Sequence, residues 1–179
     1  DFTSAYNPDV LEGLAGADTI NGGSSAPSAM TLVSYASAGS GVNRGLQLWI
    51  NLPRAEKKIA PEYEAVHGAD LPENGDAGVV TRTIIGAQSP VKLRTAVKYL
   101  HLRLQGGARF GDEIPADHVA LLYVAEGHVR IGDLELGPGE GAQPGQGEIG
   151  LLAMADAQAF LLVGKRHHEP ILHRGPYVD

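Results

Sequence analysis

Short apolar runs, separated by glycine and proline, recur along most of the chain. Several runs alternate between apolar and polar residues, which is the period of a β-strand with one buried face. The run at 97–104 is the clearest, with leucines at 100, 102 and 104 on one face and Tyr99, His101 and Arg103 on the other. The pattern predicts strands at 46–50, 79–85, 97–104, 119–125, 128–131, 134–136 and 159–163.

The glycines and prolines between these runs predict an all-β protein. The 24 glycines and 11 prolines suit tight turns, and no stretch has the period of a long amphipathic helix. Residues 53–78 combine prolines with many charges and predict a polar connection between two halves. Residues 13–29 show no periodicity and too little apolar content to anchor a sheet alone. Strands at this spacing are typical of a barrel or a sandwich.

Composition narrows the class further. A chain of 179 residues suffices for one large domain or two small barrels, and 43% hydrophobic with 20% charged residues is typical of a packed protein. The net charge of −7 argues against direct nucleic-acid binding, because no basic stripe would neutralise phosphates. Contact with a DNA-bound protein stays open.

The chain has no cysteine. This excludes disulfides, thiolate zinc sites and thiol nucleophiles, and it fits a reducing compartment. No apolar run is long enough for a membrane helix, and the first residues lack the basic and apolar regions of a signal peptide. The chain does not begin with Met, as expected of a processed, trimmed or partial sequence. We expect a cytoplasmic protein, or a nuclear one in a eukaryote, and a monomer.

A family resemblance starts from residues 45–53, which read GLQLWINLP and hold the only tryptophan, Trp49. With the segments that follow, this run resembles the pirin family, whose pattern is a Gly-(Leu/Phe)-Gln-Leu-Trp-(Val/Ile)-Asn-Leu strand, then Lys, then Pro-x-Tyr. Ordered matches cover roughly residues 37–178. Beyond the Trp49 strand, the matching segments are KK at 57–58, APEY at 60–63, SPVKLRTAVKYL at 89–100, LYVAEG at 122–127, EPI at 169–171 and RGPYV at 174–178.

The resemblance implies a bicupin, with two β-barrels in tandem, of which the first is incomplete in this sequence. Pirins typically hold iron in the N-terminal barrel. Some members resemble quercetin 2,3-dioxygenases, and others act as nuclear cofactors of transcriptional regulators. The parts that we predict are a partial N-terminal barrel at 1–53, a linker at 54–78, a C-terminal barrel at 79–165, and a segment at 166–179 that returns to the first barrel.

The iron site that the resemblance implies needs imidazoles and a carboxylate, a donor set that suits Fe(II). Pirins take two histidines from a His-Pro-His segment, and the third histidine and a glutamate from the segment just before the Trp strand. Here no histidine precedes His67, although residues 6–8 resemble the approach to the first motif. The Gly-rich turn resembles residues 38–42. Asn43 stands at the third histidine's place, and Arg44 is followed directly by the strand.

Three explanations stay open for these missing ligands: omitted segments of a longer protein, a natural metal-free pirin, or an engineered or incompletely identified chain. Omission is favoured, because two losses flank otherwise good family sequence. In the second barrel, Glu113-Ile114-Pro115 falls where a His-Pro-His would lie, and no histidine follows Pro144-Gly145 at ligand distance. We therefore assign no catalytic, cofactor-binding or metal-ligating residue, and expect a structural second barrel.

The remaining histidines favour ordinary roles. His101 and Arg103 are predicted on a solvated strand face, and His118 as a surface or hydrogen-bonded residue. Adjacent side chains of an extended chain point to opposite sides, so His167 and His168 cannot both ligate one ion without a bend, and His173 adds no ligand set. The glycines of 137–139 and 145–147 are read as turn residues, since no helix follows them. Whether Trp49 belongs to the core or lines a pocket stays open.

Two functions follow from the resemblance. One is a binding or regulatory protein with little or no catalytic activity, whose partner is a transcription regulator, a metabolic enzyme or a flavonoid-like ligand. The alternative is an iron-dependent dioxygenase of the quercetinase type, if the missing His and Glu segments exist in the full protein. No membrane partner is expected.

Overall fold

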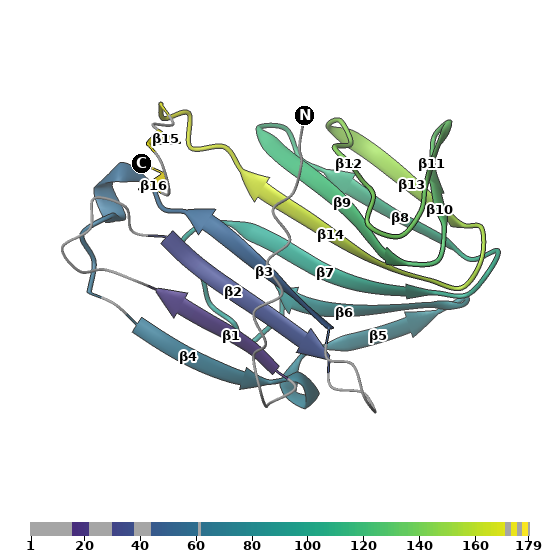
Figure 1. Ribbon diagram of the computed structural model, residues 1–179, viewed down its shortest axis with the longest axis horizontal. Helices are drawn as coiled ribbons and strands as arrows, with labels where there is room; N and C mark the ends of the chain where they lie inside the picture. The colour runs from purple at the N-terminus through teal and green to yellow at the C-terminus, as the bar shows by residue number, and fades with distance from the viewer. Residues whose placement is uncertain are drawn as a thin grey trace.

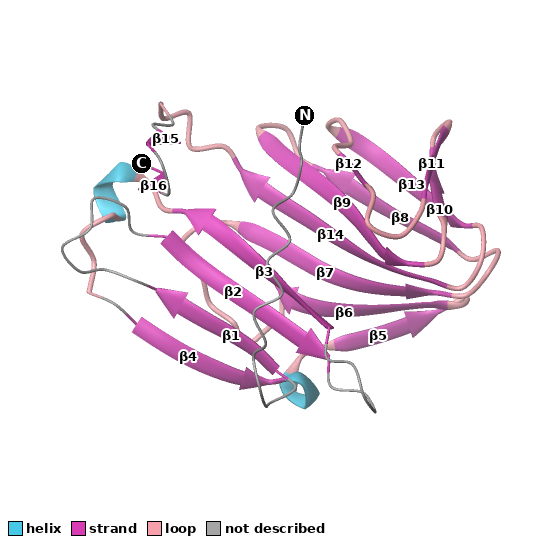
Figure 2. Ribbon diagram, viewed as in Figure 1, coloured by secondary structure: helices cyan, strands magenta, loops and turns pink. Residues whose placement is uncertain are grey.

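The computed structural model describes the backbone of residues 16–21, 30–37, 44–60, 62–170, 173–174 and 177–178. Within these ranges the chain is built almost entirely of β-strands (Figure 2). The helical elements there are two short 3-10 turns, η1 (Arg54–Glu56) and η2 (Gly68–Asp70). Of the described elements, no helix has the length and apolarity to cross a membrane. The predicted all-β class is confirmed.

The strands form antiparallel sheets that lie over one another (Figure 1). The first sheet has the order β3-β2-β1-β4 and the large sheet the order β12-β9-β14-β7-β6-β5. The third sheet has the order β11-β10-β13-β8, and β15 pairs with β16. The bounds are β1 (Gly16–Asn21), β2 (Met30–Ser37), β3 (Arg44–Asn51), β4 (Glu62–His67), β5 (Glu73–Asp76), β6 (Val79–Ile85), β7 (Val97–Leu104), β8 (Arg109–Ile114), β9 (His118–Glu126), β10 (Val129–Ile131), β11 (Leu134–Leu136), β12 (Gly141–Ala142), β13 (Gly147–Ala153), β14 (Ala157–Lys165), β15 (His173–Arg174) and β16 (Tyr177–Val178).

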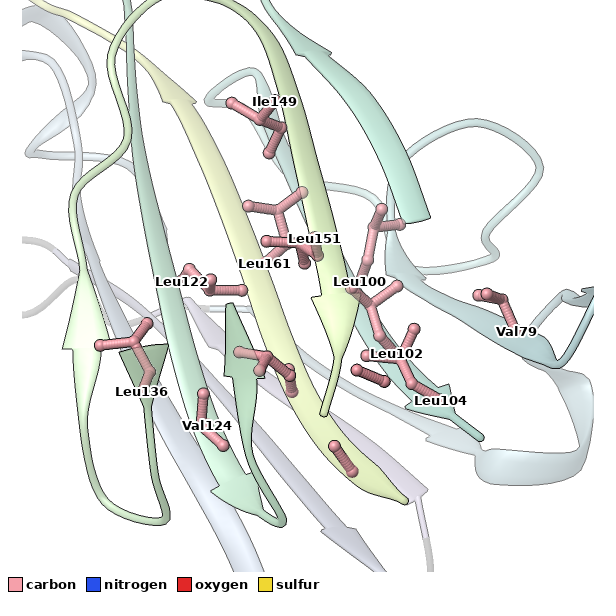
Figure 3. Close-up of a cluster of buried hydrophobic side chains, with 14 of the residues drawn as sticks. Val79, Leu100, Leu102, Leu104, Leu122, Val124, Leu136, Ile149, Leu151 and Leu161 are labelled. Atoms are coloured by element: carbon pink, nitrogen blue, oxygen red, sulfur yellow. The ribbon is translucent and has the colours of Figure 1, made fainter. Parts of the chain in front are cut away.

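The main core lies between the large sheet and the third sheet (Figure 3). Leu102, Leu122 and Leu161 come from neighbouring strands of the large sheet and are fully buried there. Leu151 of β13 faces them from the third sheet. The described strands form open sheets that face one another as in a jelly roll, which agrees with the predicted cupin-type fold.

The opposite face of the large sheet is also buried, because β3 of the first sheet packs on it. Ile50 belongs to one apolar cluster with Tyr99 and Phe160, and Leu46 and Leu48 pack against that cluster. The alternation along β3 puts these three residues on one face, as predicted, and the structure shows that this face is the inward one, which the sequence left open. Gln47 and Trp49 are exposed. The large sheet is thus the shared middle layer of the molecule.

Two sequence interpretations need correction at the level of strands. Residues 53–78 were predicted to be a polar connection, but they contain β4, which pairs with β1, and the fully exposed edge strand β5. Residues 13–29 were judged too weak to anchor a sheet, yet β1 lies between β2 and β4. The physical reason is shared: backbone hydrogen bonds join these strands, and an edge or outer strand needs no continuous apolar face. The division into domains at 53, 78 and 165 stays a prediction.

Candidate functional site

The family's metal ligands cannot be placed among the described residues. Residues 6–8, 38–42 and Asn43 lie outside them, and Arg44 is described only as the first residue of β3. In the described part of the chain, no group of three or more His, Cys, Asp or Glu side chains could hold a metal ion. The residues in view therefore do not fit an iron site, and the absence of metal ligands stays a prediction.

The outward face of the first sheet carries the tryptophan. Trp49 is 58% exposed, which answers the question left open by the sequence: it is neither core nor part of the packed interface. In the strand register Trp49 lies opposite Leu32, Leu32 opposite Ile20, and Ile20 opposite Tyr63. One residue from each of the four strands thus lies in a single cross-strand row, and the row begins at the exposed indole of Trp49.

A buried polar cluster lies on the face of the large sheet that also carries Tyr99 and Phe160, and its centre is His101. The prediction that His101 is solvated is wrong, since only 4% of it is exposed. Its ring stacks on Phe160, with centroids 4.6 Å apart and planes 8° from parallel. The register explains the contact, because His101 and Phe160 are direct partners in β7 and β14. An aromatic partner outweighs the solvation that a histidine usually keeps.

Hydrogen bonds fix the orientation of this imidazole. Gln158 Nε2 donates to Glu126 Oε2 at 2.8 Å, so the amide oxygen of Gln158 faces His101. That oxygen lies 2.9 Å from His101 Nε2 and can only accept, so Nε2 carries a hydrogen. Burial lowers the pKa of His101, and the nearby Arg103 and Arg82 charges act in the same direction, while the Gln158 hydrogen bond opposes them. The folded protein therefore favours the neutral imidazole.

An ion-pair group continues the cluster to the surface. Glu73 of β5 bridges two guanidinium groups, at 2.6 Å to Arg103 and 2.8 Å to Arg82. Burial works to raise the pKa of Glu73, but the charges and hydrogen bonds of the two arginines together lower it. Arg103 was predicted on a solvated face, and its half-exposed side chain agrees with that prediction only in part. The group keeps opposite charges in contact at the edge of the large sheet.

A hollow of about 590 Å³ opens beside this cluster, at the ends of β6, β7 and β14. Arg103, Glu126, Gln158 and Asp156 contribute to its wall. These side chains offer a guanidinium, an amide and two carboxylates, which can bind the polar groups of a small molecule. Sequence reasoning missed Glu126 and Gln158. The signal available was their position at one end of two apolar strands, on the face that also carries His101.

The other histidines take the ordinary roles that the sequence favoured. His118 Nδ1 lies 2.9 Å from the carbonyl oxygen of Ala116, so it is a hydrogen-bonded surface residue. His167 contacts the Asn51 carbonyl at 3.0 Å, whereas His168 contacts Asp117, so the two rings point to different elements, as predicted. The side chain of His173 lies outside the described residues.

Positions in the second half also agree with the sequence interpretation. Glu113 is exposed and Ile114 is buried in the main core, so the segment at the place of a His-Pro-His is an ordinary strand end. Gly139 and Gly147 have φ values of 84° and 101°, the left-handed region that turns require of glycine. These residues shape the third sheet and its connections.

Known proteins are similar to this chain in sequence and in fold. Mouse pirin is 32% identical over 145 residues, which are 75% of this chain and 50% of the mouse protein. A pirin-like protein of tomato is 32% identical over 156 residues, 79% of this chain and 52% of that protein. The chain thus spans about half the length of the curated relatives it matches. It matches no protein-family model.

The crystal structure of a quercetin 2,3-dioxygenase from Acinetobacter baumannii superposes with a TM-score of 0.73 at 25% identity, covering 92% of this chain and 67% of that one. The layered antiparallel sheets are therefore those of a cupin-type all-β protein. Within that class the chain is homologous to the pirins of animals and plants, over 75% of its length for mouse pirin and 79% for the tomato protein. The resemblance found in the sequence is confirmed.

Proposed function

We propose that this pirin-like chain acts as a binding protein, whose first sheet contacts a protein partner such as a transcription regulator or a metabolic enzyme, in the cytoplasm or nucleus. The observation that supports this proposal is Trp49, which stands 58% exposed on the outward face of a sheet. Large aromatic residues are enriched among the anchors of protein interfaces, because they bury much area at little entropy cost. The homology to pirins sets the class of protein in which this contact is proposed.

A second candidate function is favoured by the similarity to the quercetin 2,3-dioxygenase from Acinetobacter baumannii. In this alternative a fuller form of the protein holds iron and inserts oxygen into a flavonol. The described residues supply no ligand set for that iron, so no catalytic step can be assigned to them. The alternative rests on His and Glu residues outside the described part of the chain.

The two candidates differ in metal content and oxygen consumption. The purified protein is measured for intact mass and bound iron, and oxygen uptake with quercetin is followed after Fe(II) is added. The binding proposal expects uptake no faster than that of a protein-free control containing the same iron. Uptake that scales with protein concentration, together with iron bound at a fixed ratio to the chain, would establish the oxygenase and overturn the proposal.

The partner contact is tested by a matched pair of variants. Trp49→Ser removes the exposed indole, and Leu134→Ser removes a side chain that is similarly exposed, at 50%, but lies on β11 of the third sheet. A partner captured by cross-linking should be retained by Leu134→Ser and lost by Trp49→Ser. Equal capture by both variants would show that the first sheet is not the binding face. Trp49 is the only tryptophan, so its fluorescence reports directly on anything that covers this face.

A further inference from the structure

The hollow beside His101 lies at the end of the large sheet where β5, β7 and β9 end and where β6 and β14 begin (Figure 1). It measures about 590 Å³, and residues from all five of these strands line it. A hollow of this size accommodates a small organic molecule. The side chains of its wall therefore indicate which chemical groups such a molecule would carry.

Three polar residues of the wall form one row across neighbouring strands. Arg103 of β7 is the register partner of Gln158 of β14, and Gln158 is the register partner of Glu126 of β9. Neighbouring strands lie about 4.8 Å apart, so the backbones of Arg103 and Glu126 are about 10 Å apart. The row thus carries a positive group at one end, a negative group at the other, and an amide between them.

Hydrogen bonds within the protein hold each member of the row in place. Gln158 Nε2 donates to Glu126 Oε2 at 2.8 Å, and Gln158 Oε1 lies 2.9 Å from His101 Nε2. Arg103 donates to Glu73 Oε1 at 2.6 Å. A guanidinium has five N–H donors and a carboxylate about four acceptor sites, so each end of the row can bind a further group beside its present partner.

The rest of the wall is partly apolar and partly acidic. Its apolar residues can contact the methylene groups of a ligand and exclude water from them. They are Ala77, Val79, Val80, Leu104 and Ala157. The carboxylates of Asp76 and Asp156 also line the hollow. Their charge favours an ammonium group on the ligand and disfavours a second carboxylate.

We propose that the hollow binds a small zwitterion, an aliphatic amino acid whose carboxylate faces Arg103 and whose ammonium group faces Glu126. Both contacts are charge-assisted hydrogen bonds, the stronger kind. The row spans about 10 Å and each contact takes up about 3 Å, so the two charges of the ligand lie about 4 Å or more apart. Several methylene groups therefore separate them. The outward face that carries Trp49 is a different surface, so this inference does not depend on the proposed function.

Three probes with the same five-carbon chain test the two ends of the row separately. The zwitterion δ-aminovalerate carries both charges, valerate only the carboxylate, and pentylamine only the ammonium group. Each is titrated into the full chain, and the NMR shifts of the backbone amides give both the location and the affinity. We expect δ-aminovalerate to shift the amides around Arg103, Glu126 and Gln158. It should bind about tenfold more tightly than either probe with a single charge.

Two variants each remove one end of the row. Glu126→Gln keeps an oxygen that can accept the Gln158 N–H, and Arg103→Gln leaves Glu73 paired with Arg82. Each variant should weaken δ-aminovalerate about tenfold. Glu126→Gln should not weaken valerate, and Arg103→Gln should not weaken pentylamine, because each of these probes lacks the group that the removed side chain binds.

Two further variants separate the hollow from general charge effects. Gly75 lines the hollow, and a Cβ there would lie 3.8 Å from Val80 Cγ2, which is an ordinary contact. Gly75→Leu therefore fills space in the hollow without changing a charge, and it should weaken all three probes. Glu135→Gln is the matched control for Glu126→Gln, because it removes the same charge from exposed β11. It should bind every probe as the wild-type chain does.

The results that would overturn the proposal are distinct. Pentylamine binding as tightly as δ-aminovalerate would show that the acidic wall attracts any organic cation. Equal weakening by Glu126→Gln and Glu135→Gln, full affinity in Gly75→Leu, or no saturable shifts around the row would show that the hollow is not the site. The amide spectrum reports whether each variant is folded. If one charge variant fails to fold, the other variant and Gly75→Leu still decide.

Discussion

His101 should make the stability of this protein sensitive to acid. Burial lowers the pKa of His101 in the folded state, so the unfolded chain binds the proton more readily. Above about pH 6.5, the ordinary value for histidine, both states are neutral at this site and the contribution of the buried ring is fully present. As the pH falls below that value, the unfolded state takes up a proton that the folded state refuses, and stability decreases.

The magnitude follows from one proton and from the contacts of the ring. A single proton taken up only on unfolding gives a slope of at most about 1.4 kcal/mol per pH unit. His101→Gln removes this slope and keeps a donor that can face Gln158 Oε1. It also removes the stacking on Phe160, which is worth about 0.5–1.5 kcal/mol. The variant should therefore be about 1 kcal/mol less stable at pH 7.5, and this gap should close near pH 5.5.

Urea unfolding at half-unit steps of pH measures the slope of stability with pH and the difference in stability between the variant and the wild-type protein. His118→Gln is the matched control, because that ring is partly exposed and bonded only to a nearby carbonyl among the contacts described for it. The free energy of unfolding of His118→Gln should change with pH as that of the wild-type protein does. A His101→Gln variant whose stability runs parallel to the wild-type curve from pH 7.5 to 5.5 would refute the reasoning, since the buried ring would then exclude no proton.

Further substitutions test the packing and the charges. Gly127→Ala should destabilise by about 2–4 kcal/mol in urea unfolding, because a Cβ there would lie 2.1 Å from the Asp156 carbonyl oxygen and φ is +71°. Wild-type stability would show that the turn relaxes. Leu102→Ala, in the main core, should cost about 2–5 kcal/mol, and a cost below 1 would mean that the site collapses around the cavity. Glu73→Gln should cost less than about 1 kcal/mol and lose its effect in high salt, because the Arg103 pair is exposed; a larger cost independent of salt would contradict this.

The sequence predicted seven of the sixteen described strands, because alternation is a local property and marks the strands that carry a regular apolar run. Strands at 97–104 and 134–136 match their predicted limits, and the leucines of β3 were correctly assigned to one shared face. Strand β5 was missed because its four residues are all exposed, so no apolar period marks it. Its place comes from pairing with β6 along the edge of the large sheet.

The candidate cluster was largely invisible in the sequence, for a different reason. The polar face of a strand usually points to water, and for this reason the sequence predicted a solvated His101. Its burial depends on Phe160, which follows it by 59 positions in the sequence and becomes its neighbour only through the register of β7 and β14. Gln158 and Glu126 join it through the same sheet. Partners that are remote in sequence carry no local signal.

The large sheet is covered on both faces, and this ties the two halves of the chain together. Tyr99 and Phe160 contribute to the apolar surface on which the first sheet rests. A C-terminal half made alone would present that surface to water and invite self-association. Recombination that separates the halves would therefore yield an insoluble product, and selection would remove it. Because the large sheet packs against both other sheets, the two halves of the chain are expected to evolve together. A substitution on one face of a packed interface then calls for a compensating substitution on the facing sheet.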